Sequence, residues 1–206
     1  NKIMNRLLFD TFTNFGLKIS EINGGSLRNA IPRESFALVT VDTISKEAFL
    51  LETAALISNI KEEFATIESN LTIDILETTL PEKVMELGVQ EGLLKSVYAA
   101  FNGVYRMSPD IANLVETSNN IARVLVKNGE IKIGCLTRSS SETNKIDLAN
   151  SLKAAFELSG FDVELSGEYP GWQPNINSEI LAIVSKLYED LHGEKAKVEA
   201  CHAGLE

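Results

Sequence analysis

The sequence predicts an α+β fold, in which an antiparallel or mixed sheet carries helices on one face. Short runs of alternating apolar and polar residues are interleaved with amphipathic helical patterns through residues 17–167. The dipeptide Asn128-Gly129 separates two of these runs, where it is a strong signal for an antiparallel hairpin. Strands joined by hairpins, rather than only by crossover helices, favour α+β over a doubly wound parallel sheet.

The first half of the chain alternates helical and strand patterns. Gly16 follows the first helical pattern at the place of a left-handed C-terminal stop, and Ser45 is the expected N-cap of a helix of more than about twenty residues. The expected elements, in order, are a helix over 3–15, strands over 17–23 and 35–42, a helix over 45–67 and a strand over 71–78.

The second half is read in the same way from its caps and turns. Thr79 with Glu82, and Ser139 with Glu142, have the spacing of capping boxes that begin helices. The expected elements are a helix that reaches Phe101, three alternating runs within 113–140, a helix over 142–156, a strand over 161–167 and a helix over 180–191 that ends at Gly193.

The composition changes abruptly at residues 168–175, EYPGWQPN, which form a turn-rich linker. We therefore expect one domain over 1–167 and part of a second over 168–206, because the latter stretch is too short to form a domain alone. The chain begins without methionine and opens directly into a helical pattern, so we expect it to be cut from a longer chain.

Charge and composition exclude several classes of function. The formal charge of −10 argues against nucleic-acid binding, and no apolar run is long enough for a membrane span. The chain has only two histidines, His192 and His202, too few for a catalytic zinc site of its own. Cys135 and Cys201 stand in apolar surroundings, which predicts buried free thiols and suits a reducing cytosol.

Three side chains stand out as candidates for chemistry, each with a structural alternative. Asn29 lies in a strand-like crossing, where its amide can bind substrate or close a local turn. Arg138 ends an apolar strand, where a guanidinium suits either a carboxylate ligand or a rim salt bridge. His202 lies among small residues and is otherwise a satisfied core histidine. The pair Gly24-Gly25 is either an anion cradle or, more simply, a turn.

These segments resemble a known family, the bacterial aminoacyl-histidine (Xaa-His) dipeptidases of the dinuclear-zinc exopeptidase group, which includes glutamate carboxypeptidase and tripeptide aminopeptidase. The resemblance extends over essentially the whole chain. Its motifs are GGSLRNAIPRES at 24–35, YRMSPDIANLVETSNN at 105–120, CLTRSSSE at 135–142, EYPGWQPN at 168–175 and CHAGLE at 201–206.

The resemblance implies that residues 1–167 are most of a lid domain that closes over substrate, and that 168–206 return to a catalytic domain. It implies a cytoplasmic metallo-dipeptidase that hydrolyses Xaa-His dipeptides, forms a homodimer through the lid and uses two zinc ions in the full-length enzyme. The family's metal ligands have no counterpart in these 206 residues. We therefore expect this segment alone to hold no metal and to be inactive.

The resemblance also assigns roles to individual residues. Arg138 resembles the lid arginine that binds the C-terminal carboxylate of the substrate, and Asn29 the lid asparagine that contacts substrate. Weaker candidates for substrate binding are Asn120, His202, Gly204 and Glu206. Two alternatives remain open: a free-standing α+β dimerisation or binding module without catalysis, and a related metallo-exopeptidase of different specificity.

Overall fold

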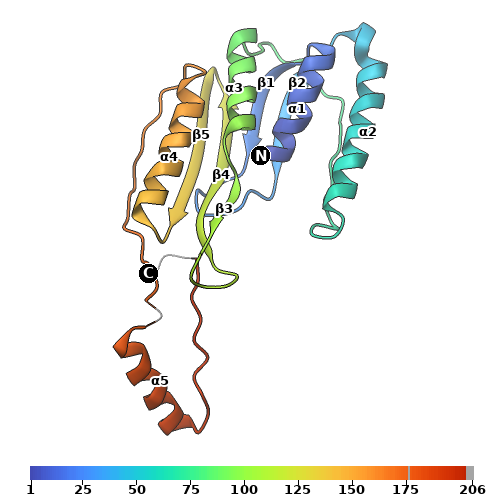
Figure 1. Cartoon of the computed structure of the whole chain (residues 1–206). Helices are drawn as coiled ribbons and strands as arrows, with labels where there is room; N and C mark the ends of the chain where they lie inside the picture. Colours follow the sequence, from blue (N-terminus) through green and yellow to red (C-terminus); the bar gives the residue numbers. More distant parts are fainter. Residues whose placement is uncertain (176, 203–206) are drawn as a thin grey trace. The chain divides into compact units, whose positions relative to one another are not determined.

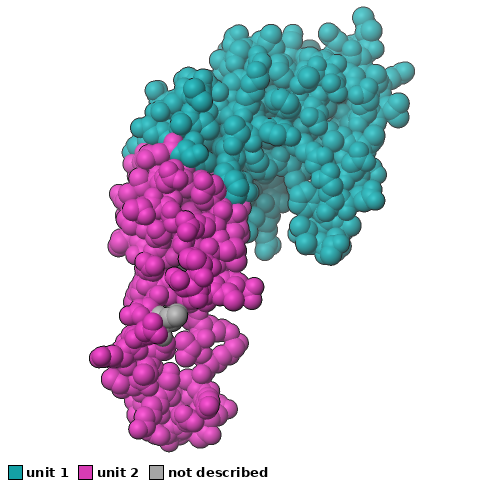
Figure 2. Space-filling view, viewed as in Figure 1, with its two compact units in different colours: residues 1–102, 120–136, 151–164 teal, residues 103–119, 137–150, 165–206 magenta. Residues whose placement is uncertain are grey.

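The computed structural model describes residues 1–175 and 177–202, and its chain divides into two compact units (Figures 1 and 2). The first unit comprises residues 1–102, 120–136 and 151–164, and the second comprises residues 103–119, 137–150 and 165–206. The predicted candidates Gly204 and Glu206 lie outside the described residues. No described helix has the length and apolar character needed to cross a membrane.

An antiparallel sheet of five strands confirms the predicted α+β class. The strand order is β2-β1-β4-β3, and β5 also pairs with β4. Strand β1 pairs with the C-terminal part of β4, where Ile22 lies opposite Val126, whereas β3 pairs with its N-terminal part. The strands are β1 (Lys18–Gly24), β2 (Ser35–Thr40), β3 (Gly103–Met107), β4 (Val115–Lys127) and β5 (Glu130–Ser139).

The predicted hairpin connects β4 to β5. Asn128 and Gly129 both have positive φ angles, 53° and 80°, as a two-residue turn of this kind requires. The sequence predicted three alternating runs within 113–140, but the first two form one continuous strand, β4. Strand β3 was not predicted. Its residues become a strand because they pair with β4, and this pairing cannot be recognised from the residues of β3 alone.

Helices α1 (Lys2–Phe15) and α3 (Leu87–Ala99) lie side by side over β1 and β2 in the first unit (Figure 1). Helix α1 ends as predicted, because Gly16 is left-handed and its N–H donates to the Phe12 carbonyl at 3.0 Å. Helix α2 (Lys46–Phe64) packs beside α1 and follows a 3-10 turn, η1 (Thr43–Ser45). Ser45 therefore precedes the helix as predicted, but its side chain makes no capping hydrogen bond.

The core of the first unit lies between this helical layer and the central strands. Fully buried side chains include Leu17 just before β1, Ile19 of β1, Leu93 and Leu94 of α3, and Ile121 of β4. These are apolar positions of the predicted strand and helix patterns, and their burial is the main source of stability.

Two predicted strands and one predicted helix start are wrong. Residues 71–78 and 161–167 form no strand, since alternation does not produce a strand without a pairing partner. The helix predicted from Thr79 begins at Leu87, where the carboxylate of Glu86 accepts the Val89 N–H at 2.9 Å. Hydrogen bonds from the backbone of Gly88 and Val89 lower the pKa of Glu86.

The second unit contains β3, the start of β4, the end of β5 and the first part of α4 (Glu142–Glu157). The predicted capping box is absent there, because Ser139 belongs to β5 and its hydroxyl accepts the Ser141 N–H at 3.0 Å. Helix α5 (Glu179–His192) ends at left-handed Gly193 as predicted, and none of its residues is buried.

The prediction of two buried thiols is wrong for Cys201, which is exposed, and Cys135 is only half-buried. Neither cysteine forms a disulfide within residues 1–175 and 177–202. Residues 195–201 form neither helix nor strand, and Val198 is 56% exposed.

Candidate substrate-binding site

Arg138 lies one residue before the end of β5 in the second unit and is half-buried. Its Nε atom is buried and has no hydrogen-bond partner within residues 1–175 and 177–202. A guanidinium binds a carboxylate through two parallel N–H groups, and an unpaired buried donor costs free energy until an acceptor arrives. Among the described residues, no carboxylate forms a salt bridge with Arg138, so its positive charge has no counter-charge there and its Nε has no acceptor.

His202 belongs to the same unit, and its Nε2 lies 2.7 Å from the Ser118 hydroxyl. Burial lowers the pKa of His202 below the ordinary 6.5, and the positive charge of Arg138 lowers it further, against the opposing effect of a hydrogen bond with the Val115 backbone. This lowering of the pKa favours the neutral imidazole of His202. In its neutral form the imidazole carries no charge, so the positive charge of the site is that of Arg138 alone among these two residues.

We expect an NMR titration of the imidazole of His202 to give a pKa below 6.5, and we expect Arg138→Gln to raise that pKa because it removes a nearby positive charge. Lys132→Gln, which removes an exposed positive charge elsewhere on β5, is the control and is expected to leave the pKa of His202 unchanged. A pKa of His202 at or above 6.5, or one that does not respond to Arg138→Gln, contradicts this description of the site.

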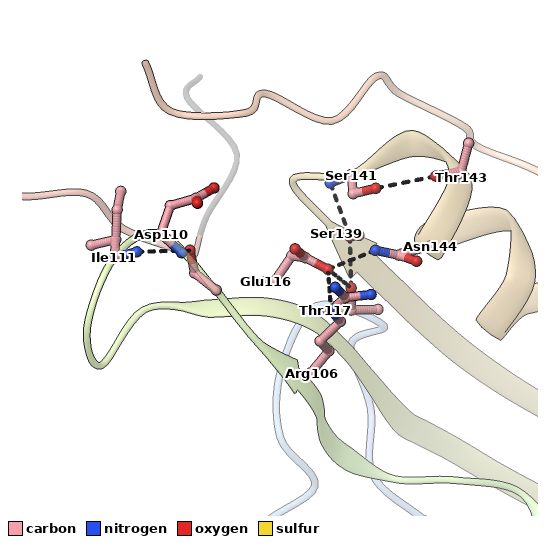
Figure 3. Close-up of polar contacts among 10 residues, drawn as sticks. Arg106, Asp110, Ile111, Glu116, Thr117, Ser139, Ser141, Thr143 and Asn144 are labelled. Atoms are coloured by element: carbon pink, nitrogen blue, oxygen red, sulfur yellow. Dashed lines mark hydrogen bonds and ion pairs between the residues drawn. The ribbon is translucent and has the colours of Figure 1, made fainter. Parts of the chain in front are cut away.

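The strand end that carries Arg138 is held by several hydrogen bonds (Figure 3). Thr117 and Ser139 share a hydrogen bond between their hydroxyls at 2.7 Å, and the Ser140 N–H donates to the Glu116 carbonyl at 3.1 Å. On the preceding residue, the Thr137 hydroxyl donates to Asn119 at 3.1 Å. These bonds connect the end of β5 to β4 on both sides of Arg138.

The predicted linker passes close to the same strand end. A side chain at Gly171 would meet the Ser139 carbonyl oxygen at 2.6 Å, so only glycine permits this approach. The Gly171 N–H donates to the Glu142 carboxylate at 3.2 Å, and the Lys145 ammonium donates to the Tyr169 carbonyl at 2.6 Å. The start of α4 therefore holds the linker.

Asn29 lies in the first unit, in a turn closed by the Ala30 N–H and the Leu27 carbonyl at 3.2 Å, and not in the strand-like crossing that was predicted. Its side chain is exposed. Asn120 donates from its amide to the Ala30 carbonyl at 2.8 Å, so it connects β4 to the turn that carries Asn29.

Gly24 and Gly25 form a turn, which was the simpler of the two interpretations of this pair, and not an anion cradle. Gly25 has φ of +70°, and a Cβ there would lie 1.9 Å from the Ala122 carbonyl oxygen. The guanidinium of Arg123 donates to the carbonyl of Gly25, to that of Gly24 at 3.2 Å and to the Asn23 side chain at 2.7 Å. Backbone carbonyls that face a cation do not form an anion cradle.

A cavity of about 300 Å³ lies between α1 and α2 and is large enough to hold a small ligand. Its polar lining includes the carboxylates of Asp10 and Glu52 but no lysine, arginine or histidine. It offers no cation for a peptide carboxylate, so Arg138 marks the better candidate site.

Ser118 and Glu116 are the main site residues that sequence reasoning missed. Both stand in an alternating strand pattern, where polar residues ordinarily face solvent. The signal available in the sequence was a run of polar residues, Glu116 to Asn120, inside an otherwise apolar strand.

The chain is similar to two dipeptidases. It is 34% identical over 209 residues to the cytosol non-specific dipeptidase of Escherichia coli strain K12, covering 100% of this chain and 42% of that protein. The crystal structure of aminoacylhistidine dipeptidase from Vibrio alginolyticus superposes with a TM-score of 0.93 at 32% identity, over 99% of this chain and 42% of that one. The chain is a homologue of part of a dipeptidase.

This homology confirms the resemblance to the dipeptidases that the motifs indicated. The chain spans about two fifths of the length of both relatives. No protein-family model matches it. Within the described residues, no group of three or more histidine, cysteine, aspartate or glutamate side chains can hold a metal ion.

Proposed function

We propose that this chain is the lid portion of a longer cytoplasmic dipeptidase, and that Arg138 binds the C-terminal carboxylate of the dipeptide. The observation that carries the proposal is the half-buried Arg138, with a buried unpaired Nε, in a chain homologous to part of two dipeptidases. A dipeptidase must recognise both ends of a short substrate. A guanidinium that makes two parallel hydrogen bonds fixes both the position and the orientation of a carboxylate.

In this proposal the remaining lid residues support binding. The exposed amide of Asn29 hydrogen-bonds the peptide, and Asn120 holds the turn that carries it. His202, Gly204 and Glu206 are the proposed residues of a loop that lines the active site. When the lid closes, these groups orient the peptide and exclude water, which are the contributions that a lid makes to catalysis.

The proposed domains are a lid over 1–167 and a partial catalytic segment over 168–206. Helix α5 supports this division, because apolar side chains project from it without cover among the described residues. These are Ile180, Ile183, Val184, Leu187 and Leu191, each more than half exposed. We propose that the rest of the longer protein covers them and supplies the ligands of the two zinc ions, none of which we assign to this chain.

The proposed substrates are dipeptides, with those that end in histidine as the preferred class. The relative from V. alginolyticus is an aminoacylhistidine dipeptidase, whereas the relative from E. coli is named a non-specific one, so a related peptidase of broader specificity is the second candidate. The E. coli protein is also named as cytosolic. The acidic charge continues to predict no nucleic-acid partner.

We also propose that the protein forms a homodimer through the lid. Strand β2 pairs only with β1 among the described strands, so its other edge is open, and Phe36 on it is 62% exposed. Sedimentation of residues 1–206 is the test, in which a dimer is expected and a monomer at all concentrations contradicts the proposal.

The experiment for the proposed function compares the complete protein with residues 1–206 on a panel of dipeptides, with zinc supplied to both. We expect the complete protein to hydrolyse dipeptides and the segment alone to hydrolyse none. Hydrolysis by the segment contradicts its assignment as a lid, and a complete protein that binds but cleaves no dipeptide supports the alternative of a binding module.

A further inference from the structure

The carboxylate of Glu116 is buried at the start of β4, with its side chain only 11% exposed. Three donors converge on one of its oxygens: the Asn144 amide at 2.7 Å, Arg106 Nε at 3.3 Å and the Thr117 hydroxyl at 3.4 Å (Figure 3). Burying a charge costs free energy even when it is paired, and an apolar side chain of similar volume often stabilises a fold as well or better. The charge at this position therefore calls for a reason other than stability.

The donors come from different elements of the second unit. Arg106 lies on β3, and Asn144 lies in the first turn of α4, which follows β5. The backbone carbonyl of Glu116 meanwhile accepts the Ser140 N–H. One residue thus holds β3, α4 and the end of β5 through its side chain and backbone together.

The hydrogen bonds around Glu116 are connected to Arg138 through the residues that follow Arg138 in the chain. Ser139 follows Arg138 directly and shares a hydrogen bond with Thr117, the residue after Glu116. The Ser139 hydroxyl also accepts the Ser141 N–H, which fixes the path into α4. A small shift of the strand end moves the guanidinium, and misplacement of a binding group by about 1 Å can cost about 100-fold in rate.

We propose that Glu116 is a positioning residue, whose buried charge holds the end of β5 so that Arg138 is aimed at the carboxylate of the substrate. This inference rests on the proposed function. Glu116 does not touch the substrate and acts only through the β5 end. Its loss therefore affects substrates that use Arg138 and spares those that do not.

The test is Glu116→Gln in the complete protein, assayed on a dipeptide and on the same dipeptide with a C-terminal amide. Glutamine keeps the shape and one acceptor oxygen but removes the charge that holds Arg106. We expect KM for the dipeptide to rise about 10-fold with kcat nearly unchanged, and the kinetics for the amide to stay the same. Glu130→Gln, which removes an exposed carboxylate paired with Lys132 on the same hairpin, is the matched control and leaves both substrates unaffected.

Two further variants keep the test decisive if Glu116→Gln folds poorly. Asn144→Ala removes the donor from α4 without introducing a charge, and we expect a smaller rise in KM for the dipeptide alone. In an Arg138→Ala background, Glu116→Gln or Asn144→Ala is expected to add nothing, because the group they position is gone.

An equal loss on the dipeptide and the amide, or additive losses with Arg138→Ala, overturns the positioning role. If Arg138→Ala raises KM but neither positioning variant does, the inference about Glu116 is wrong and the proposed function stands. If the wild-type complete protein does not distinguish the dipeptide from its amide, the proposed function itself is wrong.

Discussion

Replacing Arg138 by alanine is expected to raise KM of the complete protein for dipeptides about 100-fold, with kcat changed by no more than about threefold. In the proposed site the guanidinium contacts the substrate carboxylate, which does not react, so it contributes equally to binding of the substrate and of the transition state. About 2.7 kcal/mol of binding free energy corresponds to this change in KM. Arg138→Lys is expected to recover only part of the loss, since a point charge cannot make two parallel hydrogen bonds.

Arg6→Ala is the matched control for this experiment. Arg6 also makes a two-point contact with a carboxylate, at 2.6 and 2.9 Å from the oxygens of Glu63, but on an exposed surface of the first unit. Its loss removes an arginine and an ion pair and is expected to leave KM unchanged. A KM that does not respond to Arg138→Ala removes Arg138 from the site.

Gln90→Ala is expected to lower the free energy of unfolding of this chain by about 2–4 kcal/mol. Gln90 is fully buried on α3, and its amide accepts the Ile19 N–H and donates to the Leu17 carbonyl, both at 2.7 Å. Alanine leaves these two backbone groups without partners in the core and also opens a cavity. The measurement is denaturant unfolding of residues 1–206.

Gln173→Ala is the control for the stability experiment, because Gln173 is exposed in the linker. We expect it to change the free energy of unfolding by less than about 0.5 kcal/mol. If Gln90→Ala lowers the free energy of unfolding by less than about 1 kcal/mol, the two hydrogen bonds of Gln90 do not contribute substantially to the stability of the core.

The elements that the sequence predicts correctly are those with local signals. Gly16 and Gly193 end helices because a left-handed residue is needed there, and Asn128-Gly129 makes the hairpin because both residues accept positive φ. These requirements involve only a few neighbouring residues, so a single sequence reveals them.

The strands that the sequence misassigns depend on distant partners. Residues 71–78 alternate as a strand should but find no strand to pair with, whereas β3 has a weaker pattern and pairs with β4. Tertiary pairing overrides local propensity for these strands. The helix start is a different case, because the capping box at Thr79 is bypassed and a second local cap, Glu86, is the one used.

The residues of the candidate site also differ in whether the signal for them is local or depends on distant partners. Arg138 and His202 could be selected from sequence because each is unusual in its own segment. Ser118 and Glu116 could not, since their importance comes from contacts with His202 and with Asn144, which lie far along the chain from them. A polar residue in a strand is assigned to the solvent face unless its partners are known.

The most direct test of the central claim is the rate at which the complete protein hydrolyses a dipeptide and the same dipeptide with a C-terminal amide. If Arg138 binds the terminal carboxylate, kcat/KM for the free dipeptide exceeds that for the amide by about 100-fold, and Arg138→Ala abolishes the difference. Equal values of kcat/KM for the two substrates in the wild-type protein contradict the claim.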